Sequence, residues 1–122
     1  VEMPRCDDAT LSRHIRHAAA LLFPSFAEGY GMPLAEALAA GTPVIASDLP
    51  VFRELAGTIP RYCDPLDGAG WIEAVIDYAD GGADRDRQRA ALTDYAAPTW
   101  DDHFTTFETW LDTLSQAPVR AL

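Results

Sequence analysis

The chain has 122 residues, of which 48% are hydrophobic, and a formal net charge of −10 that includes nine arginines and no lysine. This length suits one domain with a single core and is too short for two domains. A strongly acidic surface repels phosphate backbones, so we expect no nucleic-acid partner. No apolar run approaches the roughly 20 residues that a membrane span needs, and nothing at the N-terminus reads as a secretory signal.

Short apolar segments alternate with segments of helical periodicity along the chain. In order, we expect a helix capped by Asp7 or Thr10 and ending near Ala18, a strand at 20–23, a helix at 33–40, a strand at 44–46, a helix from Pro50 to before Gly57, a strand at 59–63, helices at 71–78 and 83–95, and a last helix capped by Thr99 and ending near Leu114. This alternation predicts an α/β fold, a partial Rossmann-like parallel sheet with flanking helices. Three strands are fewer than the six or so of a complete Rossmann-like sheet, so we expect the first part of the domain to be absent.

A Glu-Gly-Tyr-Gly-Met-Pro turn begins at residue 28 and leads into the helix at 33–40. Gly29 and Gly31 permit backbone angles that other residues avoid, and they let a ligand approach the main chain. The helix that follows directs unpaired N–H groups and a partial positive charge toward the turn, which makes an anion site. Pro33 has no N–H, so the available amides are expected to be those of Gly31, Met32 and Leu34.

Two glutamates, Glu28 and Glu36, flank this turn. If the turn reverses the chain, both carboxylates face one cleft at the carboxyl edge of the sheet, where α/β proteins bind ligands. Carboxylates accept hydrogen bonds from paired sugar hydroxyls, so the pattern predicts a site for an anionic, polyhydroxylated ligand. Taken singly, Glu28 also fits a loop residue, Glu36 a helix-dipole partner on the surface, and Tyr30 a half-buried aromatic residue.

Residues 21–54 join these features in one ordered run, in which Gly41-Thr-Pro-Val-Ile-Ala-Ser follows the helix. The run resembles the nucleotide-sugar site of the retaining glycosyltransferases of family four (group 1), which have the two-Rossmann-domain GT-B fold. The resemblance implies that the chain is the C-terminal part of such an enzyme. Residues 1–98 would be a donor-binding domain that is incomplete at its N-terminus. Residues 99–122 would be a last helix and tail that cross to a missing N-terminal domain.

The resemblance also implies an activity, the transfer of a sugar from a nucleotide-diphospho-sugar to an acceptor hydroxyl with retention of configuration. It assigns Glu28 to the transferred sugar, as the catalytic residue of this piece, and Glu36 to the ribose of the donor. The expected donor-binding residues are Glu28, Gly29, Tyr30, Gly31, Met32, Leu34 and Glu36. No cofactor or obligatory metal is implied, and the location is expected to be cytoplasmic, or peripheral at the inner face of the membrane for a full-length enzyme.

Other parts of such an enzyme lie outside this chain. The Arg and Lys that neutralise the donor diphosphate come earlier in the same domain, and the acceptor site with a catalytic-region His lies in the N-terminal domain. We therefore expect the isolated chain to be inactive. Two alternatives stay open, a truncated non-catalytic domain that binds nucleotide-sugar weakly or only a protein partner, and another sugar-nucleotide enzyme such as an epimerase or a phosphorylase, which the glutamate pair disfavours.

The last helix carries an apolar stripe with four-three-four-three spacing, made of Trp100, Phe104, Phe107, Leu111 and Leu114. The stripe fits packing on the helix's own domain or, as the resemblance implies, on the missing one.

Several polar residues are interpreted as structural or solvent-facing. They are the candidate helix caps Ser47 and Asp48, Glu54, the Arg-rich helix face at 85–89, the surface histidines His14 and His17, and the reduced thiols Cys6 and Cys63.

Overall fold

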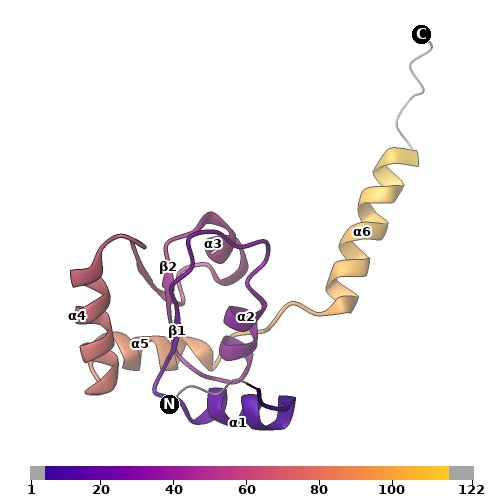
Figure 1. The fold of residues 1–122 in the computed structure, drawn as a ribbon. Coiled ribbons are helices and arrows are strands. Elements are labelled where there is room, and N and C mark those ends of the chain that lie inside the picture. Colours follow the sequence, from indigo (N-terminus) through magenta and orange to yellow (C-terminus); the bar gives the residue numbers. More distant parts are fainter. Residues whose placement is uncertain (1–4, 116–122) are drawn as a thin grey trace.

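The computed structural model describes residues 5–115, which form a three-stranded sheet surrounded by helices (Figure 1). In chain order its elements are α1 (Asp8–His17), β1 (Leu21–Phe23), α2 (Met32–Ala39), β2 (Val44–Ser47), α3 (Pro50–Ala56), β3 (Arg61–Cys63), α4 (Gly68–Ala79), α5 (Ala83–Leu92) and α6 (Trp100–Ser115). The predicted α/β class and the predicted order of elements are confirmed.

The sheet has the order β1-β2-β3, and both strand pairs are parallel. β2 lies in the centre, and all four of its residues are buried. In the register, Phe23 lies opposite Ala46, and Ser47 lies opposite Cys63. Because the strands are parallel, the segments that follow Phe23, Ser47 and Cys63 all leave the same edge of the sheet, the edge at which α/β folds bind ligands.

Alternate residues of β2 point to opposite faces of the sheet, as the period of a strand requires. Val44 and Ala46 pack with buried residues of α2 and α3. Ile45 packs on the other face, with Ala74 and Tyr78 of α4. Figure 1 shows α2 and α4 on opposite sides of the strands. Both faces of the central strand are therefore covered, which explains its continuous apolar sequence.

Two predicted helix ends are confirmed at atomic level. The carboxylate of Asp7 caps α1 by accepting a hydrogen bond of 2.7 Å from the N–H of Thr10. Gly41 has a φ of 76°, the left-handed conformation expected just after α2.

Helix α4 differs from its prediction. It begins at Gly68 rather than 71, because Asp67 caps it by accepting from the N–H of Gly70 at 3.0 Å. Its buried residues are Ala74 and Tyr78, whereas Val75 is 37% exposed.

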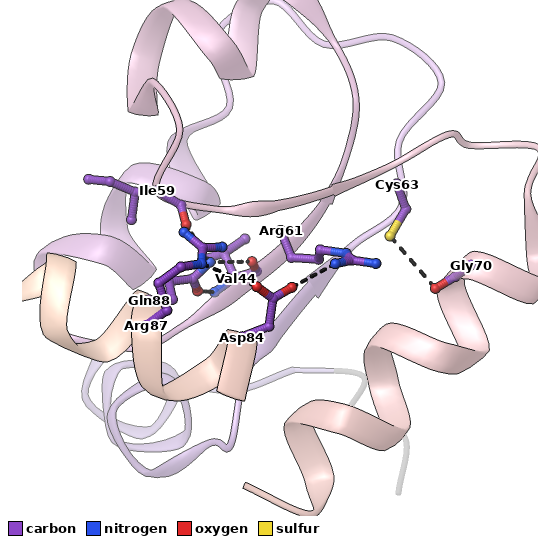
Figure 2. Close-up of polar contacts among 8 residues, drawn as sticks. All are labelled: Val44, Ile59, Arg61, Cys63, Gly70, Asp84, Arg87 and Gln88. Atoms are coloured by element: carbon purple, nitrogen blue, oxygen red, sulfur yellow. Dashed lines mark hydrogen bonds and ion pairs between the residues drawn. The ribbon is translucent and has the colours of Figure 1, made fainter. Parts of the chain in front are cut away.

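Helix α5 lies across the amino ends of the strands, and one buried side chain holds it there. Gln88 is fully buried; its Oε1 accepts from the N–H of Val44, and its Nε2 donates to the carbonyls of Val44 (3.1 Å) and Ile59 (2.7 Å), as Figure 2 shows. The interpretation of residues 85–89 as a wholly solvated face is therefore wrong. A buried amide satisfies the main-chain groups that start β2.

A second contact of α5 is ionic. Asp84 binds Arg61 of β3 at 2.7 Å and Arg87 at 3.2 Å. Desolvation raises the pKa of the Asp84 carboxyl, but hydrogen bonds from the two arginines outweigh it, so the pKa lies below its ordinary value. The hydrogen bonds of Gln88 and the ion pair between Asp84 and Arg61 thus hold α5 against the sheet.

Helix α6 extends away from the rest of the chain (Figure 1), and its residues from Trp100 to Leu114 are all exposed. Thr99 caps it as predicted: its Oγ1 accepts from the N–H of Asp102, and the Asp102 carboxylate accepts from the N–H of Thr99, each at 3.1 Å. The predicted apolar stripe is therefore uncovered. The tail after α6 lies outside the described residues.

Candidate functional site

The turn before α2 depends on the left-handed backbone conformation of Gly31. Gly31 is the N-cap of α2, with φ 92° and ψ 44°, and no side chain caps this helix. A Cβ added at Gly31 would lie 2.6 Å from Cε1 of Phe52, whose ring is fully buried and packs on Phe23 at 5.1 Å. Conformation and space both require glycine here, and Gly31 is itself buried, so the start of α2 is fixed against the core.

The amide groups of this helix start are not equally available. The N–H groups of Leu34 and Ala35 both donate to the carbonyl of Gly31, at 3.0 and 3.3 Å. The side chain of Leu34 is fully buried in the core. The first N–H groups of a helix have no acceptor within the helix, so the amides of Gly31 and Met32 remain as the natural donors to an anion, and Leu34 contributes packing.

Gly29 differs from Gly31 in its surroundings. It is absent from the glycines with a positive φ, and a Cβ added to it would meet nothing within 4 Å. The expectation that Gly29 needs a special backbone angle is therefore wrong. The structure is compatible with the other expected role of Gly29, which is to let a ligand approach the main chain closely.

The two predicted glutamates are both exposed and flank the turn. Glu28 accepts a hydrogen bond of 2.8 Å from the hydroxyl of Ser25, which restrains its carboxylate. Glu36 lies one turn into α2, on its exposed side. Ser25 has no role in the sequence analysis, although its position three residues before Glu28 is a signal for this hydrogen bond.

The residues that follow β2 form an ion pair rather than a cap. The N-cap of α3 is Leu49, and no side chain caps this helix. Asp48 instead binds Arg53 through two hydrogen bonds of 2.5 and 2.8 Å, and the Arg53 guanidinium lies 4.5 Å from the ring centre of Tyr62. The hydrogen bond from Arg53 holds the pKa of the Asp48 carboxyl below its ordinary value. Ser47 is fully buried, so neither predicted cap acts as one.

Two cavities open on the turn. The smaller, of about 260 Å³, is lined by Gly29, Tyr30, Val51, Glu54, Leu55 and Pro98. The larger, of about 600 Å³, lies between the turn and the start of α6 and is lined by Tyr30, Met32, Pro98, Thr99, Trp100, Asp102, His103 and Thr106. Glu54, which the sequence suggested was structural, thus faces the cavity beside Gly29. In the described part of the chain, Glu28 and Glu36 are exposed on the surface and line neither cavity, so the expected single cleft that both carboxylates face is not seen.

Other kinds of site are not seen between residues 5 and 115. No group of three or more His, Cys, Asp or Glu side chains is placed to hold a metal ion there. None of the helices described is long and apolar enough to cross a membrane. Cys6 and Cys63 are free thiols, one exposed and one buried. The glycine turn and its two cavities are therefore the strongest candidate site in this part of the chain.

Comparison with known proteins points to the same segment. Residues 3–59 match the sequence profile of the family described as glycosyl transferases group 1. The chain is also 47% identical over 58 residues to the O-antigen chain mannosyltransferase RfbU of Salmonella typhimurium, and 54% identical over 59 residues to the serotype-specific mannosyltransferase WbdA of Escherichia coli. A phosphatidyl-myo-inositol mannosyltransferase of Mycobacterium leprae is 35% identical over 88 residues, 70% of this chain.

The alignments with RfbU and WbdA each cover 48% of this chain. They span only 16% of the length of RfbU and 7% of WbdA, and the alignment with the Mycobacterium leprae protein spans 24% of that relative. No solved structure matches the chain significantly. The family match nevertheless includes the glycine turn, both glutamates and the strand and helix that follow. Over residues 3–59 the chain is therefore similar to the group 1 glycosyltransferases, and this similarity supports the resemblance inferred from the glutamate pair and its turn.

Proposed function

We propose that this chain supplies part of the donor site of a glycosyltransferase that uses a nucleotide-diphospho-sugar. The observation that carries the proposal is the start of α2, where Gly31 leaves the helix without a side-chain cap at the carboxyl edge of the sheet. The open N–H groups and the helix dipole favour a negative group at this point. The chain has no lysine and a net charge of −10, so it repels a diphosphate overall, and a helix start supplies a local positive potential that attracts one.

The two glutamates provide the contacts that a sugar nucleotide needs on either side of its phosphates. Glu28, restrained by Ser25, would accept hydrogen bonds from hydroxyls of the transferred sugar, and it is the catalytic residue of this piece. Glu36, one turn into the helix, would accept from the ribose hydroxyls. Hydrogen bonds to a charged acceptor are the stronger kind, so two such contacts can fix the orientation of the donor.

The chemical class of the donor follows from the relatives. Three similar proteins are named mannosyltransferases, one of them an O-antigen chain mannosyltransferase and another a serotype-specific mannosyltransferase. We extend this to a mannosyl donor and to transfer with retention of configuration, onto an acceptor hydroxyl of a polysaccharide or glycolipid. No metal is needed in this scheme, because protein groups stabilise the leaving diphosphate. The place of action would be the cytoplasm or the inner face of the membrane.

Completion of the site requires polypeptide beyond this chain. Arg53, in the helix that follows β2, is already held by Asp48, so we expect the cationic groups for the diphosphate to come from elsewhere. We therefore expect the isolated chain to bind donor weakly and to transfer no sugar. Binding through a protein partner alone is the second candidate function, favoured by the uncovered aromatic face of α6.

Ligand-observed NMR with GDP-, UDP- and ADP-sugars tests the donor site. We expect one nucleotide to bind in the millimolar range and Glu36→Ala to weaken it roughly tenfold, the effect of losing hydrogen bonds to a charged group. Glu73→Ala, an exposed glutamate of α4 on the opposite face, is the matched control and should bind as the original chain does. Equal affinity in Glu36→Ala would remove the ribose role, and no binding of any of the three would remove the donor site.

A further inference from the structure

A third glutamate, Glu54 of α3, lines the smaller cavity beside the turn together with Gly29 and Tyr30. The turn follows β1 and α3 follows β2, so both walls of this cavity leave the carboxyl edge of the sheet, where α/β folds bind ligands. Glu54 is exposed, and its carboxylate has no hydrogen bond or ion pair with any residue between 5 and 115. The described fold therefore gives this carboxylate no partner of its own.

Gly29, on the other wall, has no reason within the fold to be glycine. Its φ is not positive, and an added Cβ would meet nothing within 4 Å. Glycine at such a position lets a ligand approach the main chain closely. An unpaired carboxylate and a glycine that the fold does not require thus line the same cavity, and both indicate a ligand there.

The lining of the cavity suits a neutral ring with hydroxyl groups. Val51, Leu55 and Pro98 supply apolar surface, and no lysine or arginine lines the space, so a phosphate would meet the Glu54 carboxylate without a compensating cation. Hydroxyl groups, in contrast, donate strong hydrogen bonds to a carboxylate. The volume of about 260 Å³ is below that of sites for drug-sized ligands, so the cavity suits one ring rather than a whole nucleotide-sugar.

The cavity also lies at the right place along the turn for one end of the donor. Gly29 directly follows Glu28, the residue proposed to contact the transferred sugar, and comes two residues before Gly31. Two residues of chain span at most about 7 Å, which is close to the length of one sugar ring with its phosphate bond. A sugar joined to a phosphate at the start of α2 therefore reaches the space between Gly29 and Glu54.

We propose that the transferred sugar of the donor occupies this cavity and that Glu54 determines sugar specificity by accepting a hydrogen bond from one of its hydroxyls. The proposal rests on the proposed function, because the phosphate that carries the sugar is the one at the start of α2. Glu28 then contacts the sugar from the turn and Glu54 from α3. A sugar that lacks the hydroxyl at this point leaves the Glu54 carboxylate without a partner, so the site discriminates against it.

Ligand-observed NMR that compares nucleotide-sugars with free nucleoside diphosphates tests this role. The probe pairs are GDP-mannose with GDP and UDP-glucose with UDP. For the pair that binds, Glu54→Gln should weaken the nucleotide-sugar roughly fivefold, the effect of replacing a charged acceptor by a neutral one. The same variant should bind the free diphosphate as the original chain does or slightly more tightly, because a repulsive charge is removed.

Two more variants accompany this test. Gly29→Ala should also weaken the nucleotide-sugar more than the free diphosphate, because a methyl group at a lining position takes space from the sugar. Glu73→Gln, an exposed glutamate of α4, is the matched control and should bind both probes of a pair as the original chain does. Glu54 is exposed as well, so the circular dichroism spectrum of Glu54→Gln should equal that of the original chain.

Several outcomes would overturn the proposal. Equal weakening of the nucleotide-sugar and the free diphosphate by Glu54→Gln would mean that Glu54 supports the turn and does not contact the sugar. Unchanged or tighter binding of both would mean that its charge only repels the diphosphate. In these two cases the donor site itself stands, because the original chain binds the nucleotide-sugar. If neither pair binds the original chain, the donor site fails, and the role of Glu54 fails with it.

Discussion

Replacing Gly31 by alanine tests whether the turn is fixed by the core. Two independent costs are expected at this position. The first is conformational, because a φ of 92° is unfavourable for a residue with a side chain. The second is steric, because the new methyl group would lie 2.6 Å from Phe52. The Phe52 ring is fully buried and packs on Phe23, so it can move aside only by disturbing the core.

Two other glycines separate these costs. Gly41 has a φ of 76° but no atom within 4 Å of its Cβ position, so Gly41→Ala has only the conformational cost of about 1–2 kcal/mol. Gly31→Ala adds overpacking of about 1–3 kcal/mol, for a total of roughly 2–5 kcal/mol. Gly29→Ala has neither cost and should change the free energy of unfolding by no more than about 0.5 kcal/mol.

Urea unfolding followed by far-ultraviolet circular dichroism measures all three variants against the original chain. The expected order of stability is Gly29→Ala, then Gly41→Ala, then Gly31→Ala, and the last could be unfolded without urea if the chain is only marginally stable. Equal destabilisation by Gly31→Ala and Gly41→Ala would refute the steric part of the reasoning. A folded Gly29→Ala that no longer binds nucleotide-sugar would show close ligand approach at that position.

Three further predictions concern the rest of the fold. Gln88→Leu leaves buried main-chain groups of β2 without partners, so it should lower the free energy of unfolding by about 2–4 kcal/mol in the urea assay. The control is Arg89→Ala, on the exposed side of the same helix, which should have little effect. The ion pairs of Asp84 stabilise the fold at pH values above its ordinary pKa of 3.8, and this stabilisation is lost as the pH falls through the lowered pKa of the folded state. The melting temperature of Asp84→Asn should therefore fall less steeply below pH 3.8 than that of the original chain. An identical fall in the two melting temperatures would contradict the assignment. Removing residues 99–122 should change the free energy of unfolding of the remaining domain by less than about 1 kcal/mol, because α6 buries no side chain among its described residues, and a larger loss would show that α6 belongs to the core.

Much of the architecture follows from local sequence signals. Short apolar segments bounded by Pro and Gly predict all three strands. Residue types predict Gly41 and Thr99 as helix ends and Asp7 or Thr10 as the first cap, of which the structure selects Asp7. The boundaries were less accurate where a cap was hidden in a turn. Asp67 starts α4 earlier than its apolar periodicity indicates, because capping satisfies N–H groups whatever the apolar pattern is.

The candidate site was also only partly visible. The glycine turn and the glutamate pair stand together in sequence, so their spacing carried the prediction. The sequence could not connect Glu54 and Trp100 with this turn, because they lie 24 and 70 positions after Tyr30 and no local pattern links them to it. Their places in the two cavities depend on how α3 and α6 lie beside the turn.

The sequence by itself determined the order of strands and helices, the helix start after Gly31 and the resemblance to group 1 glycosyltransferases, since each depends on residues within a short stretch of chain. The tertiary structure alone decided that Gln88 closes the amino end of β2, that Phe52 forbids a side chain at Gly31, and that Trp100 and Tyr30 line the same cavity. The physical reason is the same in each case. Packing and hydrogen bonding between distant residues depend on the geometry of the folded chain, and no local propensity encodes that geometry.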